Sequence, residues 1–363
     1  MRTVAGVLVL GFMVGCGGAE EAPPVPPPPP PPPPPTAIVT EAPPAPAPTP
    51  PPPKPTMAEM QQAALKAIVA NANDMTKLTA LYAPDATLLT PGFPEVKGRD
   101  AIQKSNQEMM DTQSNLAAAV VRTWSKGNVI AVEFVTTGTD KATGKPWGVD
   151  GLDLLTFNDD GLITRDHTYV DFVTMMKQTG AYKGQTPGRP ILPLPTGAPE
   201  MHVSRGDATE DANVASENGL NAAWAKMDDK GAIAFFSDDL VANDFTDDQP
   251  RDKKWMKGVW AATKKAMKDP GWKDWTLFGV EDFTIDEGEY SFTQTGDFVL
   301  GKVHIPSKKK TVTGHNVEID QWKDGKIVKS WNWSNEMEFD MQLGIGPAAP
   351  KAAPKAPKAA KTK

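Results

Sequence analysis

Three side chains that could donate or accept protons lie at every second position of one short segment. His167, Tyr169 and Asp171 lie in the sequence DHTYVDF, and period-two alternation places them on one face of an expected strand. A carboxylate enclosed by apolar residues has a raised pKa, so it can exchange a proton near neutral pH. A neighbouring His or Tyr could hold an oxyanion by hydrogen bonding. Such groups could transfer a proton next to a carbonyl, and Asp153 on the neighbouring strand could share their cavity.

A purely structural role fits the same residues equally well. Asp171 directly precedes the segment FVTMMKQTG, whose start it could cap, and His167 could face solvent. The sequence alone leaves both interpretations open.

The strands expected to position these residues occur twice in the chain, as an internal repeat. Residues 148–180, GVDGLDLLTFNDDGLITRDHTYVDFVTMMKQTG, read as two strands joined by a tight turn, because Gly tolerates the positive φ of such turns. Residues 312–344, VTGHNVEIDQWKDGKIVKSWNWSNEMEFDMQLG, repeat the design at an offset of 164. Near the start of the two copies the offset is only 154, so the second copy has about ten extra residues between its start and its closing strands. The positions matched at offset 164 are Asp160-Gly161 with Asp324-Gly325, and Gly180 with Gly344.

The second copy differs from the first at the residues that could do chemistry. It has Trp331, Trp333 and Asn335 at the matching positions, and neither Trp nor Asn can act as an acid or base. Eight of the ten tryptophans belong to this copy, which favours a pocket for an apolar or stacking ligand. Core packing is the alternative explanation for most of them. His315, like His304, lies on an expected strand and could enter this cavity.

Length, net charge and the number of cysteines and histidines exclude several classes of protein and of metal site. A length of 363 residues accommodates two ordinary domains, and the net charge of −7 argues against general nucleic-acid binding. Cys16 is the only cysteine, so the folded part can hold neither a disulfide nor a cysteine metal site. The four histidines are too scattered for a recognisable zinc motif. We therefore expect no metal and no cofactor.

The first sixteen residues, MRTVAGVLVLGFMVGC, have the features of an export signal. A positive residue precedes an apolar run that is too short to span a bilayer. The ending MVGC resembles a bacterial lipobox, in which the cysteine becomes the lipidated first residue, so Cys16 is the expected lipidation site. An ordinary signal peptide with an incidental cysteine is the alternative. The expected location is the bacterial cell envelope, lipid-anchored at the outer membrane or facing the periplasm.

Low-complexity segments flank the expected domains. Residues 17–56 are a proline-rich linker, and polyproline II geometry would make it a stalk of roughly 120 Å. Residues 184–205 form a second linker, rich in proline and glycine. Residues 346–363 carry five lysines and no acid, which predicts a disordered basic tail.

The order of the expected elements is similar to that of a known family. A helical start is followed by YAPDATLLTPGFPEVKGRDAI and by strands that end in NDDGLITRDHTYVDFVTMMKQTG. Over about residues 58–183 this resembles the SnoaL-like polyketide cyclases of the nuclear transport factor 2-like superfamily. The resemblance implies an α+β fold, in which a curved antiparallel sheet wraps round N-terminal helices as a cone with one apolar cavity. It also implies that Asp171 is the acid/base, because the family's Y-x-D pattern falls on Tyr169 and Asp171.

These observations predict two such domains, 57–183 and 206–345. In the first copy we expect helices from Thr56, around 75–82 and through Met109, with strands over 85–89, 117–125 and 129–137. In the second copy we expect strands over 275–284, 289–301, 311–322 and 326–333.

Two functions from different classes follow. One is an anchored lipoprotein that binds a small hydrophobic or aromatic molecule, or a partner protein, without chemistry. The other is a cofactor-independent cyclase or isomerase that acts in the first copy only. A further possibility is that the two copies pack face to face as an intramolecular pseudo-dimer.

Overall fold

The computed structural model describes residues 54–183, 188–244, 249–301 and 303–345. The expected signal peptide with Cys16, nearly all of the proline-rich linker, and the basic tail lie outside these residues. From Lys54 on, the described chain forms one compact unit. It combines helices with two curved sheets, as the α+β prediction requires.

The first half of this unit, residues 57–203, begins with helices, continues with hairpins and ends with a short helix and an edge strand. Its large sheet has the strand order β2-β1-β6-β5-β4-β3-β7. The hairpin pairs are antiparallel, β1 pairs in parallel with β6, and β7 pairs in parallel with β3 at one edge. The elements are α1 (Met57–Ala70), α2 (Met75–Thr79), β1 (Tyr82–Leu89), β2 (Val96–Lys97), α3 (Arg99–Asp111), β3 (Gln113–Lys126), β4 (Val129–Asp140), β5 (Pro146–Phe157), β6 (Ile163–Val170), α4 (Phe172–Thr179) and β7 (Glu200–Val203).

The second half, residues 208–343, follows the same order of elements. Its sheet runs β8-β14-β13-β10-β9, with β8 parallel to β14, and a separate two-stranded sheet is made of β11 and β12. The elements are α5 (Ala208–Ala225), α6 (Asp229–Ile233), β8 (Phe236–Asp244), α7 (Lys253–Ala266), β9 (Met267–Val280), β10 (Phe283–Gln294), β11 (Phe298–Leu300), β12 (Val303–Ile305), β13 (Thr311–Lys323), β14 (Lys326–Ser334) and α8 (Glu336–Leu343).

Local sequence signals account for the ends of these elements. Thr56 and Glu59 form the expected capping box at the start of α1. Asp324 and Gly325 both have positive φ, 52° and 70°, which is the geometry of a two-residue hairpin turn. The terminal glycines of the two halves, Gly180 and Gly344, are left-handed C-caps with φ of 78° and 72°.

Three predicted segments differ from the structure. The strand expected over 289–301 is divided, because β10 ends at Gln294 and β11 covers Phe298–Leu300. The strand expected over 275–284 is interrupted, because β9 ends at Val280 and Glu281 turns the chain with φ of 56°. The linker expected over 184–205 contains β7, which adds to the edge of the first sheet beside β3. Open hydrogen-bonding groups on an edge strand accept such a segment readily, whatever its side chains.

Strand pairing locates the ten extra residues of the second half. Gly127 and Glu281 lie in equivalent turns of the two halves and are 154 residues apart in sequence. Tyr169 on β6 and Trp333 on β14 lie at equivalent strand positions but are 164 residues apart. The β11–β12 hairpin lies between these two points and accounts for the increase.

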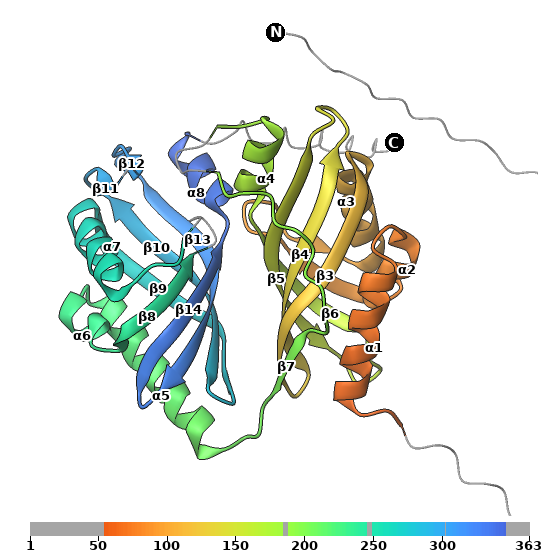
Figure 1. Ribbon diagram of the computed structural model, residues 1–363, viewed down its shortest axis with the longest axis horizontal. Helices are drawn as coiled ribbons and strands as arrows, with labels where there is room; N and C mark the ends of the chain where they lie inside the picture. Colours follow the sequence, from red (N-terminus) through yellow and green to blue (C-terminus); the bar gives the residue numbers. More distant parts are fainter. Residues whose placement is uncertain (1–53, 184–187, 245–248, 302, 346–363) are drawn as a thin grey trace, which may run out of the picture. The chain divides into compact units, whose positions relative to one another are not determined.

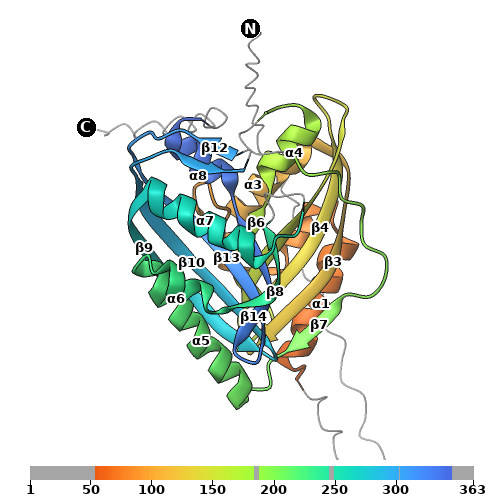
Figure 2. The ribbon, with the colours of Figure 1, turned by 60° about the vertical axis from the view of Figure 1, so that its left-hand side comes forward.

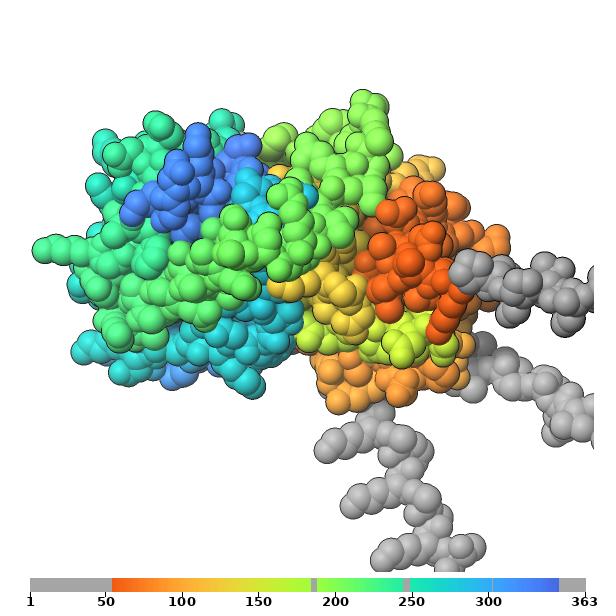
Figure 3. Space-filling model, turned by 90° about the horizontal axis from the view of Figure 1, so that it is seen from below, coloured from red at the N-terminus to blue at the C-terminus, as the bar shows by residue number. Residues whose placement is uncertain are grey.

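Each sheet has helices on one face and the other sheet on its opposite face. In the first half α1 packs on the face that presents Leu155 and Phe157, and in the second half α5 and α7 pack near Phe236 and Trp322. Figures 1 and 2 show α1 beside β3 and α5–α7 beside β8–β10. Figure 3 shows the green atoms of the α5 region at the surface, with the cyan and blue atoms of later strands around them.

The remaining faces of the two sheets share one apolar cluster, which we call the interface cluster. It is made of side chains from both sheets, so it excludes water from both at once. Its buried members are Trp124, Ala131, Leu152, Leu154, Tyr169, Phe278, Val280, Phe283, Ile285, Val317, Ile319 and Trp333.

Candidate ligand site

His167 and Tyr169 lie on the face of β6 that contacts the second half. His167 Nδ1 lies 2.5 Å from Oε1 of Glu287 on β10, and the Tyr169 hydroxyl donates to the same oxygen at 3.1 Å. Arg165 and Thr276 donate to the other oxygen, at 2.5 and 3.0 Å. Glu287 is fully buried, so these four side chains satisfy a carboxylate that could not otherwise remain charged there.

The charge state of Glu287 follows from these partners. Burial alone raises the pKa of this carboxyl, but the hydrogen bond and charge of His167, together with the Arg165 charge, outweigh burial and hold the pKa below its usual value. Glu287 is therefore ionised at neutral pH, and it ties β6 of the first half to β10 of the second.

Asp171 lies at the start of α4 rather than within the strand. β6 ends at Val170, and the Asp171 side chain accepts a hydrogen bond from the Thr174 amide at 2.8 Å as the N-cap of α4. Its second carboxylate oxygen lies 3.9 Å from the Arg189 guanidinium. Burial raises the pKa of Asp171 to about 6, against the lowering effect of these contacts. Asp171 therefore caps α4. His167 and Tyr169 form hydrogen bonds with Glu287 instead.

Asp153 faces the interior of the first half, on the opposite face from His167 and Tyr169. It pairs across the strands with Thr168, whose hydroxyl donates to Asp166 at 3.0 Å. Tyr82 donates a short hydrogen bond to the other oxygen of Asp166. Burial and the neighbouring Asp166 charge hold the pKa of Asp153 well above its usual value. The interior of this half therefore contains two close carboxyl groups, Asp153 and Asp166.

The residues expected to bind a ligand in the second half also lie on its interface face. Trp333 is a member of the interface cluster, and Trp331 packs against the cluster with the Arg122 guanidinium 4.2 Å from its ring centroid. Asn335 is the N-cap of α8, and its amide donates to the Pro91 carbonyl of the first half.

His315 shares that face of β13. Its Nδ1 lies 2.8 Å from Glu338, and its ring centroid lies 4.6 Å from that of Trp275. Burial lowers the pKa of His315, but the hydrogen bond and charge of Glu338, together with the Glu289 charge, outweigh burial and raise the pKa above its usual value. The predicted ligand-binding residues of this half thus stabilise contacts between elements.

A cavity of about 400 Å³ lies on the other face of the second sheet, under α5, α7 and α8. Its volume is in the range of small-molecule sites. Its walls combine aromatic rings, apolar side chains and a few polar groups. The lining residues are Leu220, Asn221, Trp224, Phe236, Met256, Val259, Trp260, Thr263, Met267, Trp272, Tyr290, Phe292, Phe298, Asn316, Glu318, Asn332, Ser334 and Phe339.

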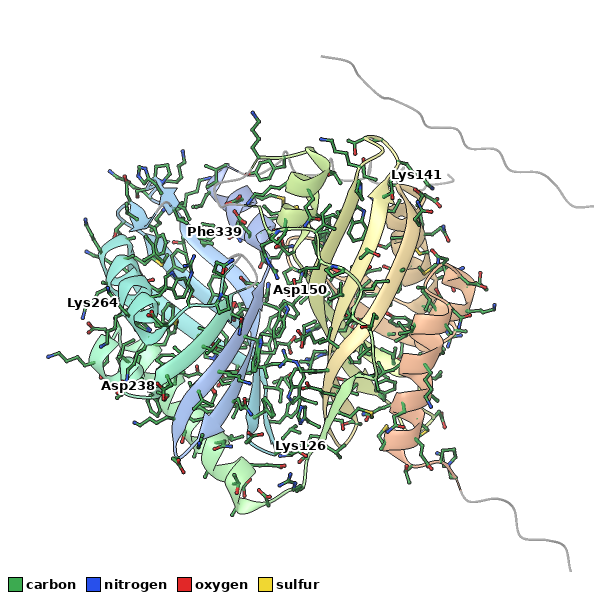
Figure 4. All side chains as sticks on the ribbon, viewed as in Figure 1. Lys126, Lys141, Asp150, Asp238, Lys264 and Phe339 are labelled. Atoms are coloured by element: carbon green, nitrogen blue, oxygen red, sulfur yellow. The ribbon has the colours of Figure 1, made fainter. Side chains whose placement is uncertain are left out.

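Several elements hold the aromatic walls in place. Trp224 of α5 and Trp260 of α7 meet edge to face, with ring centroids 5.1 Å apart. Phe339, labelled in Figure 4, comes from α8, and Phe298 comes from the β11–β12 hairpin. Trp272 lies against Gly288, where an added Cβ would be 2.5 Å from its ring, so glycine is needed for this close approach.

The polar part of the cavity comes from the sheet and α5. Glu318 on β13 pairs across the strands with Asp286 on β10, and both side chains share the interior face. Asn221 of α5 donates to Asp286 at 2.7 Å, and the Ser330 hydroxyl lies 3.2 Å from Glu318. Behind them, the buried Glu217 accepts a hydrogen bond from Thr284 at 2.7 Å.

Three buried acids around this floor, Glu217, Asp286 and Asp320, have raised pKa values. Burial is the main cause for each, and the charges of neighbouring carboxylates add to it. The pKa of Asp286 rises to about 7, and the pKa values of Glu217 and Asp320 lie well above their usual range. Asp286 can therefore take up or release a proton near neutral pH.

Among the residues that the structure describes, no group of three or more His, Cys, Asp or Glu side chains is placed to hold a metal ion. None of the helices in the same residues has the length and apolar character needed to cross a membrane.

Sequence reasoning missed the acids of the second half because their pattern is ambiguous. Glu318 and Asp320 alternate with Val317 and Ile319, which is typical of a strand with one face in solvent. The helices that cover this face are what bury them. The burial of Glu217 is better indicated by the sequence, because Glu217 lies one turn before Leu220 on the buried face of α5.

Comparisons with known proteins give one partial family match. The SnoaL-like domain family matches residues 63–166. No curated protein matches the chain.

Several solved structures are similar over about a third of the chain. AclR from Streptomyces galilaeus is 25% identical, with a TM-score of 0.35, over 39% of this chain and 87% of its own. A protein with a ketosteroid isomerase-like fold from Catenulispora acidiphila is 20% identical, with a TM-score of 0.31, over 34% and 96%. A SnoaL-like protein from Jannaschia sp. CCS1 is 16% identical, with a TM-score of 0.32, over 35% and 93%. By the family match, residues 63–166 form a SnoaL-like domain.

Proposed function

We propose that this protein is a ligand-binding lipoprotein of the cell envelope with two SnoaL-like domains, of which the second binds a small hydrophobic or aromatic molecule. The observation that carries the proposal is the cavity of about 400 Å³ in the second half, with its aromatic walls and few polar groups. The tryptophans that serve this function are Trp224, Trp260 and Trp272, rather than those of the closing strand.

The first half serves as a support in this proposal. Its sheet covers the face of the second sheet that carries Trp333 and Glu287, as one subunit of a dimer covers another. The two halves therefore act as an intramolecular pseudo-dimer, and the strands that line the cavity are held from behind. Recognition of a partner protein at the same cavity is the competing possibility.

Intrinsic tryptophan fluorescence tests the binding proposal. A panel of small aromatic ligands is titrated into the wild type, Trp272→Leu and Trp275→Leu. Trp272 lines the cavity, whereas Trp275 contacts the rings of His167 and His315 outside it. We expect Trp272→Leu to weaken binding about fivefold or more and Trp275→Leu to leave it unchanged. No saturable response to any ligand, or equal losses in both variants, would refute the proposal.

Anchoring at the envelope is proposed from the sequence of residues 1–16. Cys16 is placed as a lipidated residue would be, behind a short apolar run. Metabolic labelling with palmitate tests this: the wild type should incorporate label and Cys16→Ala should not. Labelling that persists in Cys16→Ala would refute lipidation at this residue.

The second candidate function is proton transfer by Asp171 in a cyclase or isomerase reaction. The observation that favours it is that Asp171 is 1% exposed and has its pKa raised to about 6. Its expected assistants, His167 and Tyr169, are engaged by Glu287. Turnover of an activated ketone that disappears in Asp171→Asn, with unchanged thermal stability, would support this candidate. Turnover that survives the substitution would exclude Asp171 as the acid/base.

A further inference from the structure

We propose that the cavity of the second half binds an organic cation, an amine or quaternary ammonium compound with an apolar body, whose charge lies against the tryptophan rings and beside the Glu318 carboxylate. This inference rests on the proposed function and specifies its ligand class. It is drawn from the combination, in one cavity, of aromatic walls with the Glu318 carboxylate, behind which further acids are buried.

The walls provide the first part of the argument. Trp224, Trp260 and Trp272 all border the cavity. The faces of indole rings carry negative potential and attract ammonium groups, most strongly where water is excluded. Aromatic walls therefore suit an ammonium group as well as a neutral aromatic ring, and the acids below them distinguish the two.

The floor provides the second part, and comparison with the first half shows where acids were added. Strand pairing relates Val132 to Asp286 and Leu155 to Asp320, so two apolar positions of the first half hold acids in the second, whereas Glu318 matches an acid, Asp153. Val132 and Leu155 belong to a well-packed apolar core under α1. Burying carboxyl groups in place of such side chains destabilises the fold unless they gain a partner.

The described residues do not supply a cationic partner for these acids. Within them, no Lys or Arg forms an ion pair with Glu217, Asp286 or Asp320, and the contacts that lower their pKa values are hydrogen bonds. Asp286 is 2% exposed, and its Oδ1 has no hydrogen-bond partner. The Oδ1 atom of Asn316, which lines the cavity, is also without a partner. Unused acceptors beside buried carboxyl groups point to a ligand that is positively charged or donates hydrogen bonds.

Proton release should accompany the binding of such a ligand. The acidic groups that face this floor are Glu217 from α5, Asp274 from β9, Asp286 from β10, and Glu318 and Asp320 from β13. Because Asp286 has a pKa of about 7, part of the cluster is protonated at neutral pH. A bound cation stabilises the ionised form, so its affinity should rise between pH 6 and pH 8.

The experiment compares three probes of similar size by calorimetric titration into the full chain. They are benzyltrimethylammonium, its uncharged carbon isostere neopentylbenzene, and the anion 3-phenylpropanoate. We expect the cation to bind about tenfold more tightly than the isostere, which corresponds to 1.4 kcal/mol, and the anion to bind most weakly. Binding of the cation should also be tighter at pH 8 than at pH 6.

Two variants and a control locate the effect. Glu318→Gln should weaken the cation about tenfold and leave the isostere unchanged, and Glu318→Asp should retain the preference for the cation. Asp239→Asn removes the same charge from an exposed position on β8 and should bind all three probes as the wild type does. Thermal unfolding of each variant verifies that it is folded.

The outcomes separate this inference from the proposed function. Equal affinity for the cation and the isostere would overturn the cation inference while the binding function stands. A preference for the cation that survives Glu318→Gln would overturn the assigned position of the charge. No binding of any of the three probes would count against both.

Discussion

Glu287 shows how one residue determines what its neighbours do. It is fully buried between the halves and accepts from Arg165, His167, Tyr169 and Thr276. A histidine and a tyrosine on one face of a strand, which the sequence offered as catalytic assistants, therefore serve as hydrogen-bond partners of a carboxylate that lies 118 residues or more away in sequence. Spacing along a strand identifies a shared face, but it does not tell which side of the sheet that face covers.

Removing this carboxylate should destabilise the whole unit. Glu287→Ala leaves the partly buried Arg165 guanidinium without its carboxylate and removes a hydrogen-bond partner from the buried His167 and Tyr169, so we expect a loss of about 3–5 kcal/mol in the free energy of unfolding. Glu289→Ala, on the same strand but half-buried, should cost less than about 1 kcal/mol. Urea denaturation of both variants measures the difference. Equal effects would show that the buried network contributes little.

Ionisation of the acids beneath the cavity should destabilise the fold, whereas the Glu287 carboxylate stabilises it. Asp286 has its pKa raised to about 7 by burial, so the folded protein binds its proton more tightly than the unfolded chain. The resulting loss of stability develops as pH rises from about 4 to about 7 and is complete above that range. Asp286→Asn should therefore raise the melting temperature at pH 8 and change it little at pH 4. A lower melting temperature at pH 8 would contradict this assignment.

At the scale of elements, the β11–β12 hairpin is the clearest addition to the second half. It accounts for the ten residues by which the offset between the halves grows, and it supplies Phe298 to the cavity. Val299, the next residue, is 53% exposed and does not line the cavity. The hairpin thus presents one side chain to the ligand space and the next to solvent.

This alternation gives a matched pair of variants. Phe298→Ala should weaken binding of an aromatic ligand about fivefold or more, because a wall of the cavity is lost. Val299→Ala should bind as the wild type does. Fluorescence titration of both variants measures the effect, and both should melt at the wild-type temperature. Equal affinities for the two variants would show that the hairpin does not contact the ligand.

Elements were more predictable from the sequence than the site. Turns with Asp-Gly, the capping box at Thr56 and the terminal glycines are specified by local backbone preferences, so they were found where expected. The cavity was not located, because acids that alternate along a strand look the same whether solvent or a helix covers them. Asp171 illustrates the boundary case, since its position before a helix indicated capping as clearly as chemistry.

At the scale of the whole molecule, the two sheets share their largest apolar cluster. Trp124 and Leu154 of the first half pack with Phe283, Val317 and Trp333 of the second. Neither sheet could be exposed on this face without transferring large apolar surfaces to water. The halves are therefore expected to depend on each other for stability.

Calorimetric unfolding of the chain should consequently show one cooperative transition. The van't Hoff and calorimetric enthalpies should agree, as they do when a protein unfolds in two states. Val317→Asp, which places a charge in the interface cluster, should lower the melting of both halves together. Two separate transitions in the wild type would show that the halves are independent.

A crystal structure of the protein soaked with benzyltrimethylammonium tests the central claim most directly. We predict density for the ligand in the cavity of the second half, with its charged group near Glu318 and the ring of Trp272. Density beside Asp171 in the first half, with the second cavity empty at saturating ligand, would contradict the account.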